Sequence, residues 1–358
     1  MSLHRPGPAS LTGFEPGGRP PRRRLWPFVA GGAVAGLLVV ALVAAFVIRP
    51  DNGTAAAEPV PSPPVLADGV TAGGQITGQA RTLSDALARR GLECSVRFTG
   101  ADGGQTGCFT FREAGRTASE VVYQYRPDGT IIGLNIKVAA TESTETAPGL
   151  RALVNTVAPI VFPADRAKVT TVLQAWGGWA YGSWGDYEIV SRGPKTLVIA
   201  SKADTTPIKV PVVHLDTAEA ALAEGLRADG FRCARDDESC RSRYAAKGAL
   251  TVTMSGPDTG ITYLAAAASD MSAGAERAVT EKAFTTLFGR VFGHVQGSAV
   301  TPFGQWLEAH WDGRSHTAFV AGWRLDLQLI HGTTAATKKL PTQVKLTIFN
   351  EEVWQVPM

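Results

Sequence analysis

The stretch WLEAHWDGRSH, at residues 306–316, places four side chains that could act as acids, bases or metal ligands close together. They are Glu308, His310, Asp312 and His316. Two imidazoles beside two carboxylates could bind zinc or exchange protons near neutral pH. The spacing matches no established metal-ligand motif, and no third fixed ligand is evident. We therefore expect a polar loop here, between two helices or between a helix and a strand, and we assign no metal, no cofactor and no catalytic residue.

A second candidate is the aromatic stretch WGGWAYGSWGDY, at residues 176–187. Exposed aromatic rings among glycines can stack on sugars, lipids or peptide side chains. Trp176 ends a helical pattern and Trp184 begins a strand pattern, so we expect these two rings in the core. Trp179 and Tyr181 are the possible ligand contacts, with ordinary burial as the alternative.

Other signals exclude several classes of function. YGSWG, at residues 181–185, lacks the first glycine of a nucleophile elbow, and GADGGQTG, at 100–107, lacks the Lys-Ser/Thr of a phosphate loop. From residue 51 onward, 29 Lys and Arg stand against 31 Asp and Glu. This part is not basic, so we expect no nucleic-acid partner.

The four cysteines are Cys94, Cys108, Cys233 and Cys240. An even number of cysteines in an oxidising compartment favours disulfides. We expect one bond within the first pair and one within the second, because each pair belongs to one of two repeated units. Free or crossed thiols are the alternatives. A metal site is disfavoured, since no CxxC or HxxxH spacing occurs.

The two units are visible as blocks of similar residues in the same order. The blocks repeat at offsets of 139 or 130 residues: Leu83, Leu87, Gly91 and Cys94 with Leu222, Leu226, Gly230 and Cys233; Pro127 with Pro257; Val154–Val161 with Phe284–Val291; Trp184 with Trp323. Gly-rich or polar loops between the blocks can absorb the change of offset. We predict a duplication, with a first unit over 81–212 and a second over 213–358.

The elements of each unit follow from the spacing of apolar residues. Leu83 and Leu87 have helical spacing, and Gly91 is placed to end that helix. Alternating apolar residues on both sides of RPDGT, at residues 126–130, predict a hairpin with one buried face. The expected order is a helix, about four strands, one or two helices and two strands. This order predicts an α+β fold with an antiparallel sheet and helices on one face.

The N-terminal part predicts a membrane anchor. Leu25–Ile48 is a run of 24 residues without an ionisable side chain, and Arg22–Arg24 precede it. About 20 such residues cross a bilayer, and concentrated arginine stays on the cytoplasmic side. We therefore expect residues 1–24 to form a cytoplasmic tail and 25–48 a transmembrane helix. A cleaved signal peptide is the alternative. Gly32 and Gly36 form a GxxxG pair that could support a homodimer in the membrane.

Residues 49–80 are rich in Pro, Gly and Ala and predict an extracytoplasmic linker. Together these features predict a single-pass plasma-membrane protein with its two units outside the cytoplasm. No nucleophile, base and metal set converges in the sequence, so we expect a non-enzymatic binding or scaffolding module of the cell envelope. Its partner would be an envelope protein or a wall polymer. The alternative is an envelope hydrolase whose site lies where the two units meet.

Overall fold

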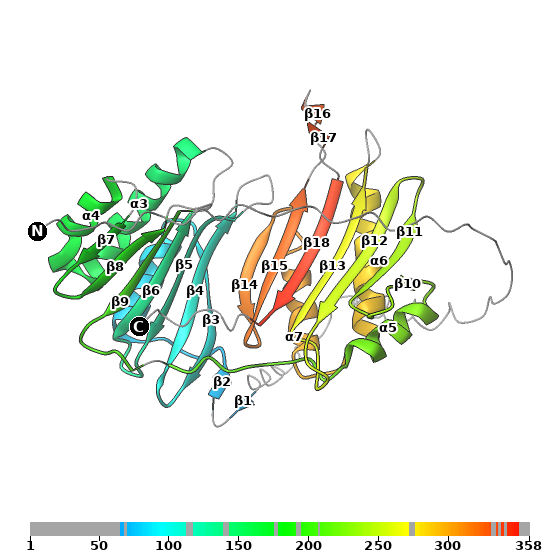
Figure 1. The fold of residues 1–358 in the computed structure, drawn as a ribbon, viewed down its shortest axis with the longest axis horizontal. Coiled ribbons are helices and arrows are strands. Elements are labelled where there is room, and N and C mark those ends of the chain that lie inside the picture. The colour runs from blue at the N-terminus through cyan, green and yellow to red at the C-terminus, as the bar shows by residue number, and fades with distance from the viewer. Residues whose placement is uncertain are drawn as a thin grey trace, which may run out of the picture. The chain divides into compact units, whose positions relative to one another are not determined.

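The computed structural model describes residues 65–67, 70–111, 117–138, 143–174, 178–190, 195–206, 208–271, 276–330, 334–335, 338–339 and 342–350. They form a mixed α+β structure with antiparallel sheets and helices, as expected (Figure 1). The segment 25–48, with Gly32 and Gly36, lies outside the described residues. No helix within the described ranges is long and apolar enough to cross a membrane.

The first half of this structure is built around a nine-stranded antiparallel sheet, whose order is β1-β2-β3-β4-β5-β6-β9-β8-β7. Its elements are β1 (Val65–Ala67), β2 (Val70–Ala72), α2 (Gly78–Ala88), β3 (Glu93–Gly100), β4 (Gly103–Phe111), β5 (Thr117–Tyr125), β6 (Ile131–Val138), α3 (Ser143–Val161), the 3-10 helix η1 (Pro163–Asp165), α4 (Arg166–Gln174), β7 (Gly178–Tyr181), β8 (Gly185–Val190) and β9 (Lys195–Ser201).

The second half is built around a seven-stranded antiparallel sheet, whose order is β10-β11-β12-β13-β18-β15-β14. Its elements are α5 (Glu219–Ala228), β10 (Arg232–Cys233), β11 (Ser239–Tyr244), β12 (Gly248–Ser255), β13 (Tyr263–Asp270), α6 (Arg277–His294), α7 (Val300–Ala309), β14 (His316–Val320), β15 (Trp323–Ile330) and β18 (Thr342–Phe349), with a small separate hairpin of β16 (Thr334–Ala335) and β17 (Lys338–Lys339).

Apart from β1 and β2, the two sheets have the same strand order. In each half a helix precedes four consecutive antiparallel strands, and the last strand of the half pairs with the fourth: β9 with β6, and β18 with β13. Each half closes its sheet with three strands rather than the expected two. The additional strands are β7 and β14, which end their sheets.

The first helix of each half ends in the same way. Leu87 and Leu226 are fully buried, and their carbonyls accept hydrogen bonds from the N–H groups five residues on, at 3.2 and 2.9 Å. The intervening Gly91 and Gly230 have φ values of +83° and +85°. Glycine adopts this left-handed conformation without a steric penalty, so both helices stop where the sequence predicted.

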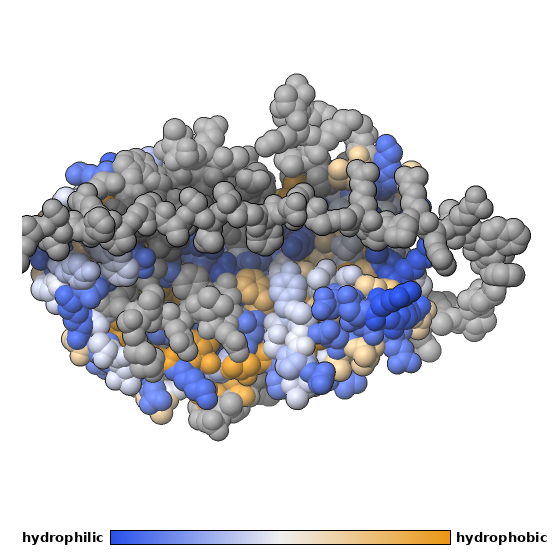
Figure 2. All heavy atoms as spheres, viewed as in Figure 1, coloured by the Kyte–Doolittle hydropathy of each residue, from blue (hydrophilic) through white to orange (hydrophobic). Residues whose placement is uncertain are grey.

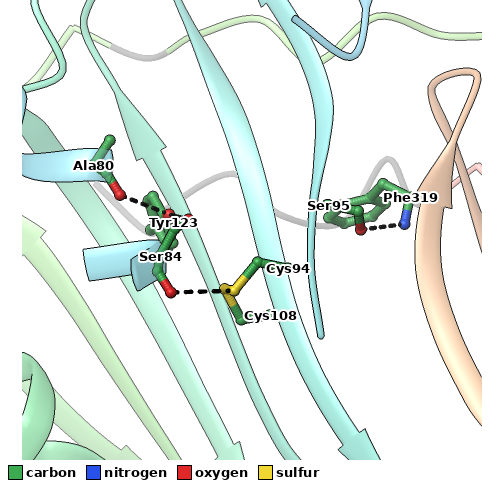
Figure 3. Close-up of a disulfide and its surroundings, with 7 residues drawn as sticks. All are labelled: Ala80, Ser84, Cys94, Ser95, Cys108, Tyr123 and Phe319. Atoms are coloured by element: carbon green, nitrogen blue, oxygen red, sulfur yellow. Dashed lines mark hydrogen bonds between the residues drawn. A yellow bond between two sulfur atoms is a disulfide. The ribbon is translucent and has the colours of Figure 1, made fainter. Parts of the chain in front are cut away.

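Both expected disulfides are present. Cys94–Cys108 joins β3 to β4, and Cys233–Cys240 joins β10 to β11, in each case between directly opposite residues. The Cys94 sulfur lies 3.6 Å from the carbonyl oxygen of Ser84 on α2, as Figure 3 shows. In the second half the Cys233 sulfur lies 3.5 Å from a carbonyl oxygen of α5. Each disulfide thus packs against the first helix of its half.

Each half buries one face of its sheet beneath its helices, around a core of its own. In the first core, α2, α3 and α4 cover apolar residues of β5 and β6; in the second, α5, α6 and α7 cover those of β13, β15 and β18. Strand alternation explains this arrangement. In β11, for example, Cys240 is buried while Arg241 and Arg243 are exposed. Figure 2 shows mainly hydrophilic residues over this part of the molecule.

The expected linker over 49–80 is partly wrong. Its last residues contain β1 and β2, and α2 begins at Gly78. Thr71 and Ala72 of β2 pair with β3, and Leu66 of β1 packs against the second core. Single apolar residues among prolines and glycines give no periodicity, yet β2 pairs with β3 and Leu66 packs against a core that the rest of the chain forms.

Candidate functional site

The histidines of the 306–316 stretch lie where α7 ends and β14 begins. His310 is the C-terminal cap of α7, and His316 is the first residue of β14. The two rings are 4.9 Å apart, and His316 Nε2 lies 2.9 Å from Asp312 Oδ1. Glu308 and Asp312 are exposed, but His316 is only 7% exposed. Residues 310–315 connect a helix to a strand, which is one of the two kinds of loop expected from the sequence, and His316 is buried where this loop ends.

The carboxylate of Glu93, from the first half, lies beside these residues, so Glu93, His310, Asp312 and His316 form one cluster. Glu93, the first residue of β3, places its Oε2 3.1 Å from His316 Nδ1. One potential ligand atom from each of Glu93, His310 and His316 lies within 4.8 Å of the other two. Glu93 did not emerge from the sequence, because it precedes His316 by 223 residues. The contact exists because β14 packs against β3 and β4.

The two carboxylates favour the protonated form of His316. Burial alone lowers the pKa of this imidazole, but hydrogen bonds to Asp312 and Glu93 and their charges raise it above its usual value. For Asp312, burial acts to raise the pKa, but the hydrogen bond from His316 lowers it. The two acidic side chains beside His316 thus favour its imidazolium form.

Polar contacts next to the cluster hold the two halves together. Arg324 of β15 donates two hydrogen bonds of 2.9 Å to Glu120 of β5, and both side chains are almost fully buried. The N–H of Phe319 donates to Ser95 Oγ at 2.7 Å (Figure 3). The Phe319 ring also packs edge-on against that of Phe109. These contacts fix β14 against β3 and β4, and with it the distance from Glu93 to His316.

The aromatic stretch forms a separate surface on β7. Trp179 and Tyr181 are 57% and 67% exposed, whereas Ala180 between them packs against the core. Because side chains alternate along a strand, the two rings project from the same face of β7. Their partners across the strand pair are Glu188 and Asp186 of β8.

A lysine adds a positive charge to this surface. Lys202 Nζ lies 5.8 Å from the centre of the Tyr181 ring and 2.9 Å from Asp186 Oδ1. The rings, the two carboxylates and the ammonium group together offer flat apolar contacts beside hydrogen-bonding groups. The possible ligand contacts expected from the sequence are therefore both exposed and close to polar partners.

A buried aspartate supports the turn between β7 and β8. Asp165 accepts hydrogen bonds of 2.6–2.8 Å from Ser183 N–H and hydroxyl, Trp184 N–H and the Tyr187 hydroxyl. Burial acts to raise the pKa of Asp165, but these hydrogen bonds hold it well below its usual value. A Cβ at Gly182 would collide with the Asp165 carboxylate, so this turn requires glycine.

The sequence predicted that Trp176 and Trp184 lie in the core, and this is confirmed in part for Trp184. Trp184 is half-buried and packs against Phe162 at the edge of the first core, with ring centroids 6.0 Å apart. Trp323, which the sequence pattern aligns with Trp184, is 1% exposed. Trp176 lies outside the described residues.

Comparison of the chain with protein-family models, with curated proteins and with solved structures gave no match. The function must therefore be argued from the residues and their geometry.

Proposed function

We propose that this chain is a membrane-anchored extracytoplasmic protein whose β7 surface binds a glycan of the cell-wall polymer. We define the β7 surface as Trp179, Tyr181, Asp186, Glu188 and Lys202. The observation that carries the proposal is the exposure of two large aromatic side chains on one face of a strand. The apolar segment 25–48 supports the anchor, and the two disulfides are compatible with a site outside the cytoplasm.

The chemistry of the β7 surface favours a sugar polymer over a protein strand. Alternate residues on a strand are about 7 Å apart, so the two rings form adjacent platforms for successive flat apolar faces. The neighbouring carboxylates and Lys202 can hydrogen-bond hydroxyl groups. A protein strand would instead pair along the backbone of β7, but this strand has four residues, and short edge strands resist such pairing.

The proposal also includes the duplication. The two sheets share a strand order, and the helix ends and cysteines occur at equivalent places in both. The second half has no counterpart of the Trp179–Tyr181 pair in β14, which contains Phe319 as its aromatic residue. We infer that after duplication one half kept or gained the glycan surface while the other supports it.

Retention on purified peptidoglycan sacculi tests the glycan proposal. The detergent-solubilised full chain should sediment with sacculi, and Trp179→Ala and Tyr181→Ala should each weaken binding about 3- to 10-fold, as expected for loss of one aromatic stacking contact. Met271→Ala is the matched control, because Met271 is a large apolar residue 55% exposed elsewhere. Wild-type protein that stays in the supernatant, or aromatic variants that sediment like wild type, would refute the proposal.

A hydrolase centred on the cluster between the halves is the second candidate. It is favoured by the meeting of Glu93 with His316, which places an imidazole and two carboxylates within reach of proton transfer. A hydrolase should release soluble fragments from the same sacculi, and His310→Ala should abolish that release while retention persists. If the wild-type chain releases nothing, this candidate fails.

A further inference from the structure

We propose that Glu93, His310 and His316 form a zinc site that joins the two halves of the ectodomain. The three side chains come from three places in the fold: the start of β3, the end of α7 and the start of β14. Imidazole nitrogen and carboxylate oxygen are the ligands that zinc commonly takes when thiolates are absent. This inference rests on a different surface from the glycan proposal and is independent of it.

In each histidine, one ring nitrogen forms a hydrogen bond to an acceptor oxygen, and the other nitrogen is the metal ligand. His310 Nδ1 lies 2.7 Å from the Trp306 carbonyl oxygen; a carbonyl can only accept, so this nitrogen carries a proton and Nε2 is the ligand. His316 Nε2 donates to Asp312 at 2.9 Å, and its Nδ1 faces Glu93. Metal-binding histidines are usually oriented by such hydrogen bonds to a carbonyl or a carboxylate.

The ring geometry fits two ligands of one ion. Imidazoles bound tetrahedrally to zinc, with nitrogens about 2.0–2.1 Å from the metal, have ring centroids about 5 Å apart. The rings of His310 and His316 are 4.9 Å apart at an interplanar angle of 70°. The Trp306 ring stacks on His310 at 4.8 Å and holds it in place.

The proposed site is open to solvent on the side of Glu93. His316 is buried, but the Glu93 side chain is 55% exposed, so the ion can arrive from solvent on that side. Three protein ligands leave one position for water. On binding, zinc replaces the proton that His316 Nδ1 shares with Glu93, and this proton passes to solvent.

Zinc binding to the full-length chain in detergent, after removal of metals with EDTA, tests this site. We expect one zinc ion per wild-type chain by calorimetric titration, and a rise in the thermal midpoint when zinc is added. His310→Ala and Glu93→Gln should each weaken zinc binding at least tenfold and remove the rise in midpoint. Both residues are more exposed than His316, so these variants are expected to fold, which far-ultraviolet circular dichroism verifies.

His294→Ala is the matched control. His294 is the last residue of α6, and its Nε2 also pairs with a carboxylate, that of Asp229 at the end of α5, at 3.0 Å. Its zinc affinity should equal that of wild type. The proposal is overturned if wild type binds no zinc, if His310→Ala and Glu93→Gln bind like wild type, or if His294→Ala weakens binding equally. Retention on sacculi is not a readout here, so failure of the zinc site and failure of the glycan surface are distinguishable.

Discussion

Asp165 shows how one buried carboxylate organises a candidate binding surface. It is 1% exposed and accepts hydrogen bonds from the turn that follows Trp179 and Tyr181. Because the charge is satisfied by several donors, its burial is compatible with a stable fold. The same hydrogen bonds fix the end of β7, and so the Tyr181 ring at that end.

This arrangement predicts how stability depends on pH. The pKa of Asp165 is lowered in the folded chain relative to its usual 3.8, so the ionised form stabilises the fold above that value. The contribution should disappear as pH falls from about 4 toward the lower folded-state pKa. Asp165→Asn should lower the free energy of unfolding by about 2–3 kcal/mol at neutral pH, because charge-assisted hydrogen bonds are lost.

Urea unfolding at neutral and acidic pH measures this effect. The difference between wild type and Asp165→Asn should shrink in acid, whereas Asp258→Asn, at an exposed turn residue, should resemble wild type at both pH values. A neutral-pH stability of Asp165→Asn equal to that of wild type would contradict the role given to this carboxylate.

At the residue scale, Trp179 and Tyr181 could be predicted as candidate site residues from the sequence, whereas the contact of Glu93 with His316 could not. Trp179 and Tyr181 could be singled out because their types and their glycine neighbours are unusual within one stretch. Glu93 could not be found this way, since its relation to His316 depends on the packing of β14 against β3. Asp165 was missed for a related reason: two of its four donors are backbone N–H groups, which carry no residue-type signal, and all four lie 18–22 residues away in the sequence.

At the scale of elements, the disulfides make a quantitative prediction. Cys94–Cys108 spans 14 residues and Cys233–Cys240 spans 7. On the chain-entropy model the first should contribute about 3 kcal/mol and the second about 2.5 kcal/mol. Replacing both cysteines of a pair by alanine should lower the free energy of unfolding by these amounts.

Urea unfolding with and without reductant tests both pairs. Reductant should destabilise wild type, and a variant that lacks one pair should respond less than wild type does. If reductant leaves the wild-type unfolding curve unchanged, the bonds are either absent or without effect on stability.

The elements with strong periodicity were predictable, and the short edge strands were not. The helix of Leu83 and Leu87 and the hairpin around RPDGT have long apolar patterns, and both form as expected. In contrast, β7 has four residues, with its large aromatic side chains exposed, so it lacks the pattern of a buried strand. Both β1 and β2 have three residues; β2 pairs with β3, and β1 pairs only with β2 among the described strands.

At the scale of the whole molecule, the contact between halves is polar as well as apolar. A buried ion pair is weak evidence of stability, but it specifies geometry, because an unpaired charge there is costly. Glu120 and Arg324 form such a pair, and Arg97 donates to the Gly322 carbonyl and to Asn350 nearby. These directional contacts select one arrangement of β14 against β3. The proposed zinc site requires this arrangement, because Glu93 comes from the first half and both histidines come from the second.

Labelling of lysines can test the proposed location of the C-terminal part outside the cytoplasm. No lysine precedes Lys137, so amine labelling of lysines reports on the C-terminal part alone. Lys168, Lys209 and Lys282 are exposed in the structure and should react freely. A membrane-impermeant amine reagent added to intact cells should therefore modify all three, as detected by mass spectrometry. A cytoplasmic protein in the same cells provides the control and should be labelled after lysis only. If the three lysines also require lysis, the positive-inside orientation inferred from Arg22–Arg24 is wrong, and a wall glycan cannot be the ligand of the β7 surface.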